Sequence, residues 1–235
     1  MKKGFSLLES LLGLVVFSLI ILGSLEFFGT VQTVFFRLQS GQENRQAAWA
    51  ALDKIRTDFV LAGQGLARPM RLGLVNGVER DGETWILRRT NRCPKLTADP
   101  ISGRTALNVT DADEDLAGRA LCLFDETKGE TIFIREAGNG IITLASPLQH
   151  DYRAAEATVI VLQKTSLYLE ASKGVLRRKS DEASAQPLLE DVSAFELRYD
   201  PESCLAFARI SLLSAPEEFY EIQFLAKNAA LGKTP

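Results

Sequence analysis

The feature that most constrains this chain is an apolar run near its N-terminus. Between residues 5 and 25 the one ionisable residue is Glu9, and the others are Leu, Val, Ile, Phe, Gly and Ser. About twenty such residues form a helix that crosses the hydrocarbon core of a bilayer. Lys2 and Lys3 precede the run, so we expect the short end to stay in the cytoplasm and the bulk of the chain to cross. A secretory signal peptide fits poorly, because the run is too long and no small-x-small cleavage site follows it.

The helical pattern continues past the apolar run and becomes amphipathic. Apolar residues recur there at spacings of four and three, which is one face of a helix. They are Ala48, Leu52, Ile55, Phe59 and Ala62. No proline occurs before Pro69, and the glycines at 63 and 65 favour a helix end. We therefore expect one helix over residues 5–62, with its first half in lipid and its second half lying on a sheet.

The rest of the chain has the pattern of short strands separated by turn residues. The expected strands are 84–87, 120–124, 130–135, 141–144, 158–162, 167–169, 175–177, 192–200, 207–213 and 219–226. Gly138-Asn139-Gly140 predicts a hairpin turn between two of them. Loops are expected between residues 88 and 121. The sequence thus predicts an α+β fold, in which a long helix covers an antiparallel sheet.

Two of the late strands suggest a buried face. In 192–200 the candidates are Phe195, Leu197 and Tyr199. In 219–226 they are Phe219, Ile222 and Phe224, but their alternation is imperfect and leaves the register open.

The segment Gly4-Phe5-Ser6-Leu7-Leu8-Glu9, after two lysines and before the apolar run, resembles the class III signal of type IV pilins and pseudopilins. The resemblance implies cleavage by prepilin peptidase between Gly4 and Phe5 and methylation of the new Phe5 amine. Glu9 then becomes the fifth mature residue, the position where this family keeps a glutamate for filament assembly. A lone carboxylate in lipid is costly, and pairing with the Phe5 ammonium of a neighbouring helix would compensate it.

The resemblance implies a pilin-like fold with four parts. Residues 1–4 are the leader, 5–28 the transmembrane and filament-core helix, 29–63 its amphipathic continuation, and 64–235 a β-rich periplasmic domain. Residues 42–66 and 188–200 are similar to segments of PilW-type minor pilins, and the second is also similar to J-type pseudopilins of type II secretion.

These likenesses imply a minor pilin of a type IV pilus that helps to initiate or cap the filament, held in the inner membrane before assembly. A J-type pseudopilin is the alternative within this class, and a tip-exposed adhesin or DNA-binding subunit is the alternative of another class. The expected partners are other minor pilins or pseudopilins, the major pilin, prepilin peptidase and the inner membrane.

Three cysteines are too few for a disulfide scaffold. Cys93 and Cys122 lie in a part of the chain expected in the periplasm, where a disulfide between them could persist. The alternative is that Cys122, inside an apolar run, is simply a core residue.

Asp111, Asp113 and Asp115 alternate as calcium ligands do, but Leu116 and Cys122 stand where an EF-hand loop has its glycine and glutamate. A solvated acidic turn is the alternative, and we expect no cofactor.

The sequence does not indicate an enzyme. His150 is the one histidine, and neither a nucleophile nor a glycine-rich oxyanion motif accompanies it. The net charge of −3 gives no reason to expect a nucleic-acid partner.

Overall fold

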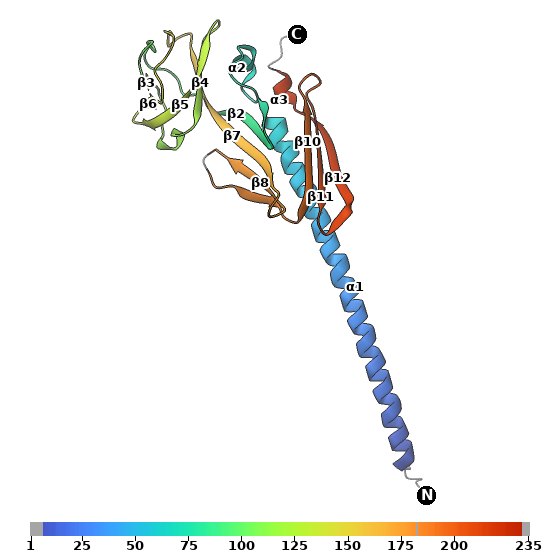
Figure 1. Ribbon diagram of the computed structural model, residues 1–235. Helices are drawn as coiled ribbons and strands as arrows, with labels where there is room; N and C mark the ends of the chain where they lie inside the picture. Colours follow the sequence, from blue (N-terminus) through green and yellow to red (C-terminus); the bar gives the residue numbers. More distant parts are fainter. Residues whose placement is uncertain (1–6, 182, 232–235) are drawn as a thin grey trace. The chain divides into compact units, whose positions relative to one another are not determined.

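The computed structural model describes residues 7–181 and 183–231 and has an α+β architecture (Figure 1). Helix α1 (Leu7–Leu61) comes first and antiparallel strands follow. The chain divides into two compact units, the first ending at Ala47 and the second beginning at Ala48. The second unit therefore includes the last turns of α1, earlier than the boundary at residue 64 that the sequence predicts. The two units are described separately.

In the first unit, α1 exposes its large apolar side chains along its length. Leu11, Phe17, Leu25 and Phe36 are each more than half exposed. Hydroxyl groups in this part of the helix bond to their own backbone: Ser18 Oγ donates to the Leu14 carbonyl at 2.8 Å and Thr33 Oγ1 to the Gly29 carbonyl at 2.8 Å. These bonds satisfy polar groups without water.

The second unit contains two sheets. The larger has the order β1-β2-β7-β4-β5-β6-β3, and β8 pairs with both β7 and β9; the smaller has the order β10-β11-β12. The strands of the larger sheet are β1 (Val78–Asp81), β2 (Thr84–Arg92), β3 (Ala106–Asn108), β4 (Ala120–Phe124), β5 (Gly129–Gly138), β6 (Ile141–Leu144), β7 (Thr158–Glu170), β8 (Val175–Ser180) and β9 (Gln186–Leu189). The smaller sheet comprises β10 (Val192–Asp200), β11 (Leu205–Leu212) and β12 (Ala215–Leu225). Short helical segments are α2 (Ala67–Arg71), η1 (Glu114–Leu116) and α3 (Lys227–Ala230).

The last turns of α1 lie between the two sheets, with β2, β7 and β8 on one side and β10–β12 on the other (Figure 1). The predicted apolar face is confirmed, since all five of its residues are at most 1% exposed. Phe59 is central to this core. Its ring lies 6.2 Å from that of Trp85, 6.3 Å from Tyr199 and 5.5 Å from Phe224, measured between centroids. One aromatic side chain of the helix thus contacts both sheets.

A second core fills the part of the larger sheet formed by β3 to β6 and the start of β7. Strand β4 is buried on both faces: Leu121 and Leu123 pack into this core, whereas Cys122 and Phe124 pack with Leu66 into a third cluster. A strand covered on both sides needs a continuous apolar run rather than alternation. This explains the sequence Ala-Leu-Cys-Leu-Phe at 120–124.

The predicted hairpin is confirmed as β5 and β6. Asn139 and Gly140 connect them and have φ values of 51° and 73°. Two consecutive positive φ angles are required by the two-residue turn that matches the twist of a hairpin.

Several expectations are corrected. The strands expected at 158–162 and 167–169 are one strand, β7, because different neighbours pair with its two halves. In β12 the buried residues are Tyr220 and Phe224, with Ile222 partly buried, whereas Phe219 is 57% exposed. Alternation along a strand puts residues 220, 222 and 224 on one face and 219 on the other. The region expected to be loops, residues 88–121, contains the end of β2, all of β3 and η1.

The end of α1 is held by the last described helix. Asn228 Nδ2 donates to the Val60 carbonyl at 2.5 Å. Gly63, with φ of 82°, ends the helix, and a Cβ there would lie 2.9 Å from the Ala229 nitrogen. This close approach requires glycine, because any other side chain would displace α3.

A buried ion pair joins α1 to β8. Arg178 Nε and Nη2 donate to the two carboxylate oxygens of Asp58 at 2.6 and 3.1 Å, and Asp58 is 8% exposed. The Asp58 hydrogen bond raises the pKa of Arg178. The paired, bidentate geometry compensates the cost of burying both charges.

We expect Asp58→Asn to lower the free energy of unfolding of the full chain in detergent by about 2–3 kcal/mol, because the partly buried Arg178 loses its counter-charge. Denaturant titration followed by circular dichroism measures this. Asp53→Asn is the matched control on the same helix: Asp53 pairs with Arg56 at 2.9 Å but its side chain is 63% exposed, so the expected loss is below about 0.5 kcal/mol. Equal losses in the two variants would contradict the assignment.

Candidate functional site

The first candidate site is the N-terminal part of α1. Gly4 and Phe5, the expected processing residues, lie outside the described residues. Glu9 lies in the first turn of α1 and is exposed. An acidic residue in the first turn interacts favourably with the helix dipole.

Helix α1 is long and apolar enough to cross a membrane. In the described part of the chain it is the one helix with that property. Its apolar residues extend past the expected span at 5–28: Val34, Phe35, Phe36 and Leu38 are all exposed.

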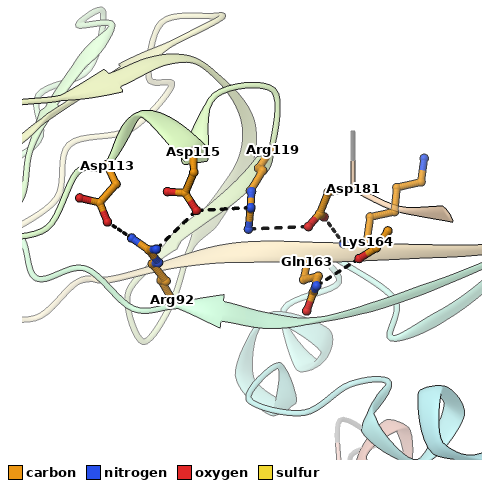
Figure 2. A network of polar contacts seen from close by, with 8 residues as sticks. Arg92, Asp113, Asp115, Arg119, Gln163, Lys164 and Asp181 are labelled. Atoms are coloured by element: carbon orange, nitrogen blue, oxygen red, sulfur yellow. Dashed lines mark hydrogen bonds and ion pairs between the residues drawn. The ribbon is translucent and has the colours of Figure 1, made fainter. Parts of the chain in front are cut away.

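The second candidate site is a network of charged side chains in the second unit (Figure 2). Arg92, at the end of β2, donates to Asp113 through Nη1 and to Asp115 through Nη2, the latter at 3.4 Å. Arg119 continues the chain of contacts: its Nη2 lies 3.5 Å from Asp115 Oδ2 and its Nη1 3.7 Å from Asp181 Oδ2. The Asp113 hydrogen bond is the main cause that raises the pKa of Arg92.

This network accounts for the aspartates considered as calcium ligands. Asp113 and Asp115 face arginines, and Asp111 accepts a hydrogen bond from Thr110 Oγ1 at 3.0 Å. Within residues 7–181 and 183–231, no cluster of three or more His, Cys, Asp or Glu side chains could hold a metal ion. Arg92 lies about twenty residues before the two aspartates it pairs with, and Arg119 lies four residues after Asp115. The spacing of the aspartates alone did not reveal these partners.

A pocket lies beside β7, between the point where β4 stops pairing with one edge of this strand and the point where β8 begins to pair with the same edge. β4 pairs with residues 158–161 of β7, and β8 pairs with residues 165–170. Asp181 closes the gap between them: its amide donates to the Lys164 carbonyl and its Oδ1 accepts from the Lys164 amide, both at 2.7 Å. We call the resulting cavity of about 130 Å³ the fork pocket. It is lined by Arg88, Gly118, Arg119, Ala120, Phe133, Leu162, Lys164 and Asp181.

The sequence did not indicate this pocket. Arg88 belongs to a basic cluster at 88–95, and such a cluster alone does not indicate a pocket. The other two cations, Arg119 and Lys164, are isolated in the sequence. They come together because β7 pairs with three different strands, which is a property of the topology.

The three cysteines are free, so the structure does not contain the expected Cys93–Cys122 disulfide. Arg92 pairs with Val161, and Val161 pairs with Leu121 on the other side. Cys93 and Cys122 therefore come directly after residues on two strands that are separated by β7. The backbones of two such strands lie about 9–10 Å apart, whereas a disulfide needs Cα atoms within about 7 Å. Cys122 is a core residue, and burial raises the pKa of its thiol.

Comparisons with known proteins give no family. No family model matches this chain, and no curated protein matches it. Among solved structures, the tailspike of Acinetobacter baumannii bacteriophage AP22, in complex with capsular saccharide, is 13% identical over 33% of this chain and 15% of its own, with a TM-score of 0.29. The tailspike protein of Pseudomonas phage LKA1 is 15% identical over 31% of this chain and 15% of its own, with a TM-score of 0.26. This chain thus covers well under a fifth of either tailspike, and at these scores neither likeness bears on fold or function.

Thiol chemistry tests the cysteine assignment. We expect a thiol reagent to modify Cys93 in the folded protein, because it is exposed, and to modify the buried Cys122 and Cys204 only after unfolding. Partial desolvation raises the pKa of Cys93, so its rate should keep rising as pH increases through the alkaline range, where more thiolate forms. Protection of both Cys93 and Cys122 in protein that has not been reduced, relieved by a reductant, would instead establish the disulfide.

Proposed function

We propose that this chain is a minor pilin of a type IV pilus, processed by prepilin peptidase and helping to initiate or cap filament assembly. The observation that carries the proposal is the apolar surface of α1 in the first unit. From Leu11 to Leu38 its large apolar side chains are exposed. This stretch measures on the order of 40 Å at about 1.5 Å per residue, whereas the hydrocarbon core is about 30 Å thick.

A membrane anchor alone would leave the excess apolar surface in water. Val34, Phe35 and Phe36 lie in the part of the helix beyond a single span, and each is between 49% and 61% exposed. Packing against similar helices of other subunits would bury them, as happens when apolar side chains interdigitate along helices. A helix-cored filament therefore provides a use for the full length of the apolar segment.

Glu9 gives the assembly a register. In the proposed mature chain, its carboxylate pairs with the N-terminal ammonium of a neighbouring subunit, and each charge compensates the other. Because a carboxylate in lipid is costly, formation of this pair between subunits favours assembly. The proposal places the mature protein in the inner membrane, with its second unit in the periplasm, before it enters the filament.

The second unit would determine which subunits are neighbours. Its core is anchored on the last turns of α1, so its surface is presented by the same helix that packs in the filament. The proposed partners are other minor pilins and the major pilin.

Deletion of the gene tests the proposal against its alternatives. We expect a strain without the gene to lose surface pili by electron microscopy while it secretes enzymes normally. Lost secretion with intact pili would overturn the proposal in favour of a type II secretion pseudopilin. Normal pili and normal secretion would also overturn it, and would direct attention to a tip-exposed binding subunit.

Substitution of Glu9 tests the mechanism. In a strain complemented with Glu9→Gln, we expect the protein to remain in the membrane fraction while its amount in sheared filaments falls by about tenfold or more, because a neutral amide cannot pair with an ammonium. Quantitative immunoblotting of both fractions measures this. Glu26→Gln is the matched control, since it makes the same change further along the same helix. Equal incorporation of the two variants would contradict the role of Glu9.

A further inference from the structure

The fork pocket carries an inference that does not depend on the proposed function. Its lining includes three cationic side chains, from Arg88, Arg119 and Lys164, and one carboxylate, from Asp181. They come from β2, the loop before β4, β7 and the end of β8. Figure 2 shows Arg119 directed toward Asp181, whereas the Lys164 side chain points away from both and meets Asp181 through its backbone.

Arg119 is held loosely for a side chain that is only 17% exposed. Its two ion contacts, with Asp115 and Asp181, measure 3.5 and 3.7 Å. A charge-assisted hydrogen bond between a guanidinium and a carboxylate is usually 2.7–2.9 Å long. The guanidinium donors of Arg119 are therefore available to an oxyanion that enters the pocket.

The other two cations add to this capacity. Arg88 uses Nη1 for its contacts with Glu79 and with the Asn76 carbonyl. Its Nε and Nη2 donors are left to bind a ligand. The ammonium of Lys164 makes no ion pair with any residue in the described part of the chain. Asp181 is already occupied, because its Oδ1 accepts from the Lys164 amide.

The remaining lining is apolar. Leu162 is buried, Ala120 is partly buried, and the ring of Phe133, which is 63% exposed, forms part of the wall. The volume of about 130 Å³ is about ten times the 10–15 Å³ that a cavity needs to hold one water molecule. The pocket can therefore hold more than a bare anion. Pockets that combine an apolar wall with a few convergent polar groups are typical of small-molecule sites.

We infer that the fork pocket binds a small organic oxyanion. Arg119 holds its carboxylate or phosphate group, Arg88 and Lys164 add positive charge, and its apolar part lies against Phe133 and Leu162. Bidentate bonding by a guanidinium suits either oxyanion.

Isothermal titration calorimetry of the full chain in a non-ionic detergent tests the inference with three probes. Benzoate and phenyl phosphate share a ring and differ in the anionic head, so they distinguish the two chemistries; benzamide is the uncharged control. We expect saturable binding of at least one anion at millimolar concentration, with no binding of benzamide. Arg119→Gln should weaken binding about tenfold or more, because a charged hydrogen-bond partner is lost. Lys164→Gln should weaken it by a smaller factor, because it removes a nearby charge rather than a direct partner.

Lys95→Gln is the matched control, since it removes the same charge from an exposed lysine that does not line the pocket. Lys164 is also exposed, so its substitution should leave the fold intact even if Arg119 contributes to stability through Asp115 and Asp181. Equal binding by all variants, equal binding of benzamide, or no binding of either anion would each overturn the inference.

Discussion

The structure of the second unit depends on one buried helical face. The side chains of Ala48, Leu52, Ile55 and Phe59 are almost fully removed from water, and strands from both sheets pack against them. The smaller sheet depends on this face most, since it has three strands and a sheet of that size needs a packed partner. The Asp58–Arg178 pair fixes the rotation of this helix, because a bidentate contact tolerates little displacement.

Where the sequence predicted the fold well, a single local period determined the structure. The helical face at 48–62 and the Asn139-Gly140 turn were both confirmed, because a 3.6-residue repeat and a pair of left-handed residues each specify one conformation. Prediction was weaker where tertiary pairing decides. The sequence predicts a break in β7 where the polar residues Gln163 and Lys164 stand, but the strand is continuous. These two residues lie between the part of β7 that pairs with β4 and the part that pairs with β8. Phe219 faces outward because strand alternation outweighs its hydrophobicity. The fork pocket lay beyond prediction for the same reason: its cations meet only through the strand order.

Helix α1 is adapted to two different environments. From Leu11 to Leu25 it carries apolar residues on all sides, as a helix surrounded by lipid or by other apolar helices must, and exposed apolar side chains continue to Leu38. From Ala48 onward it carries charged residues such as Asp53 and Lys54 beside the buried face, as expected where one side meets water. The proposed filament role uses the first pattern, and the fold of the second unit uses the other. The fork pocket belongs to neither, which is why its ligand can be tested independently.

The contact between α3 and the end of α1 has a consequence for synthesis. The helix is translated first, yet Ala226 and Ala229 complete its core and Asn228 bonds to Val60. Contacts between residues so distant in sequence form late, because a long loop must close first. The side of the helix that packs against β10–β12 and α3 therefore stays uncovered until those elements are made. A ribosome stalled before residue 226 would hold a nascent chain in which the core between the two sheets is incomplete. A chaperone that shields an amphipathic helix would have its longest opportunity to bind during that interval.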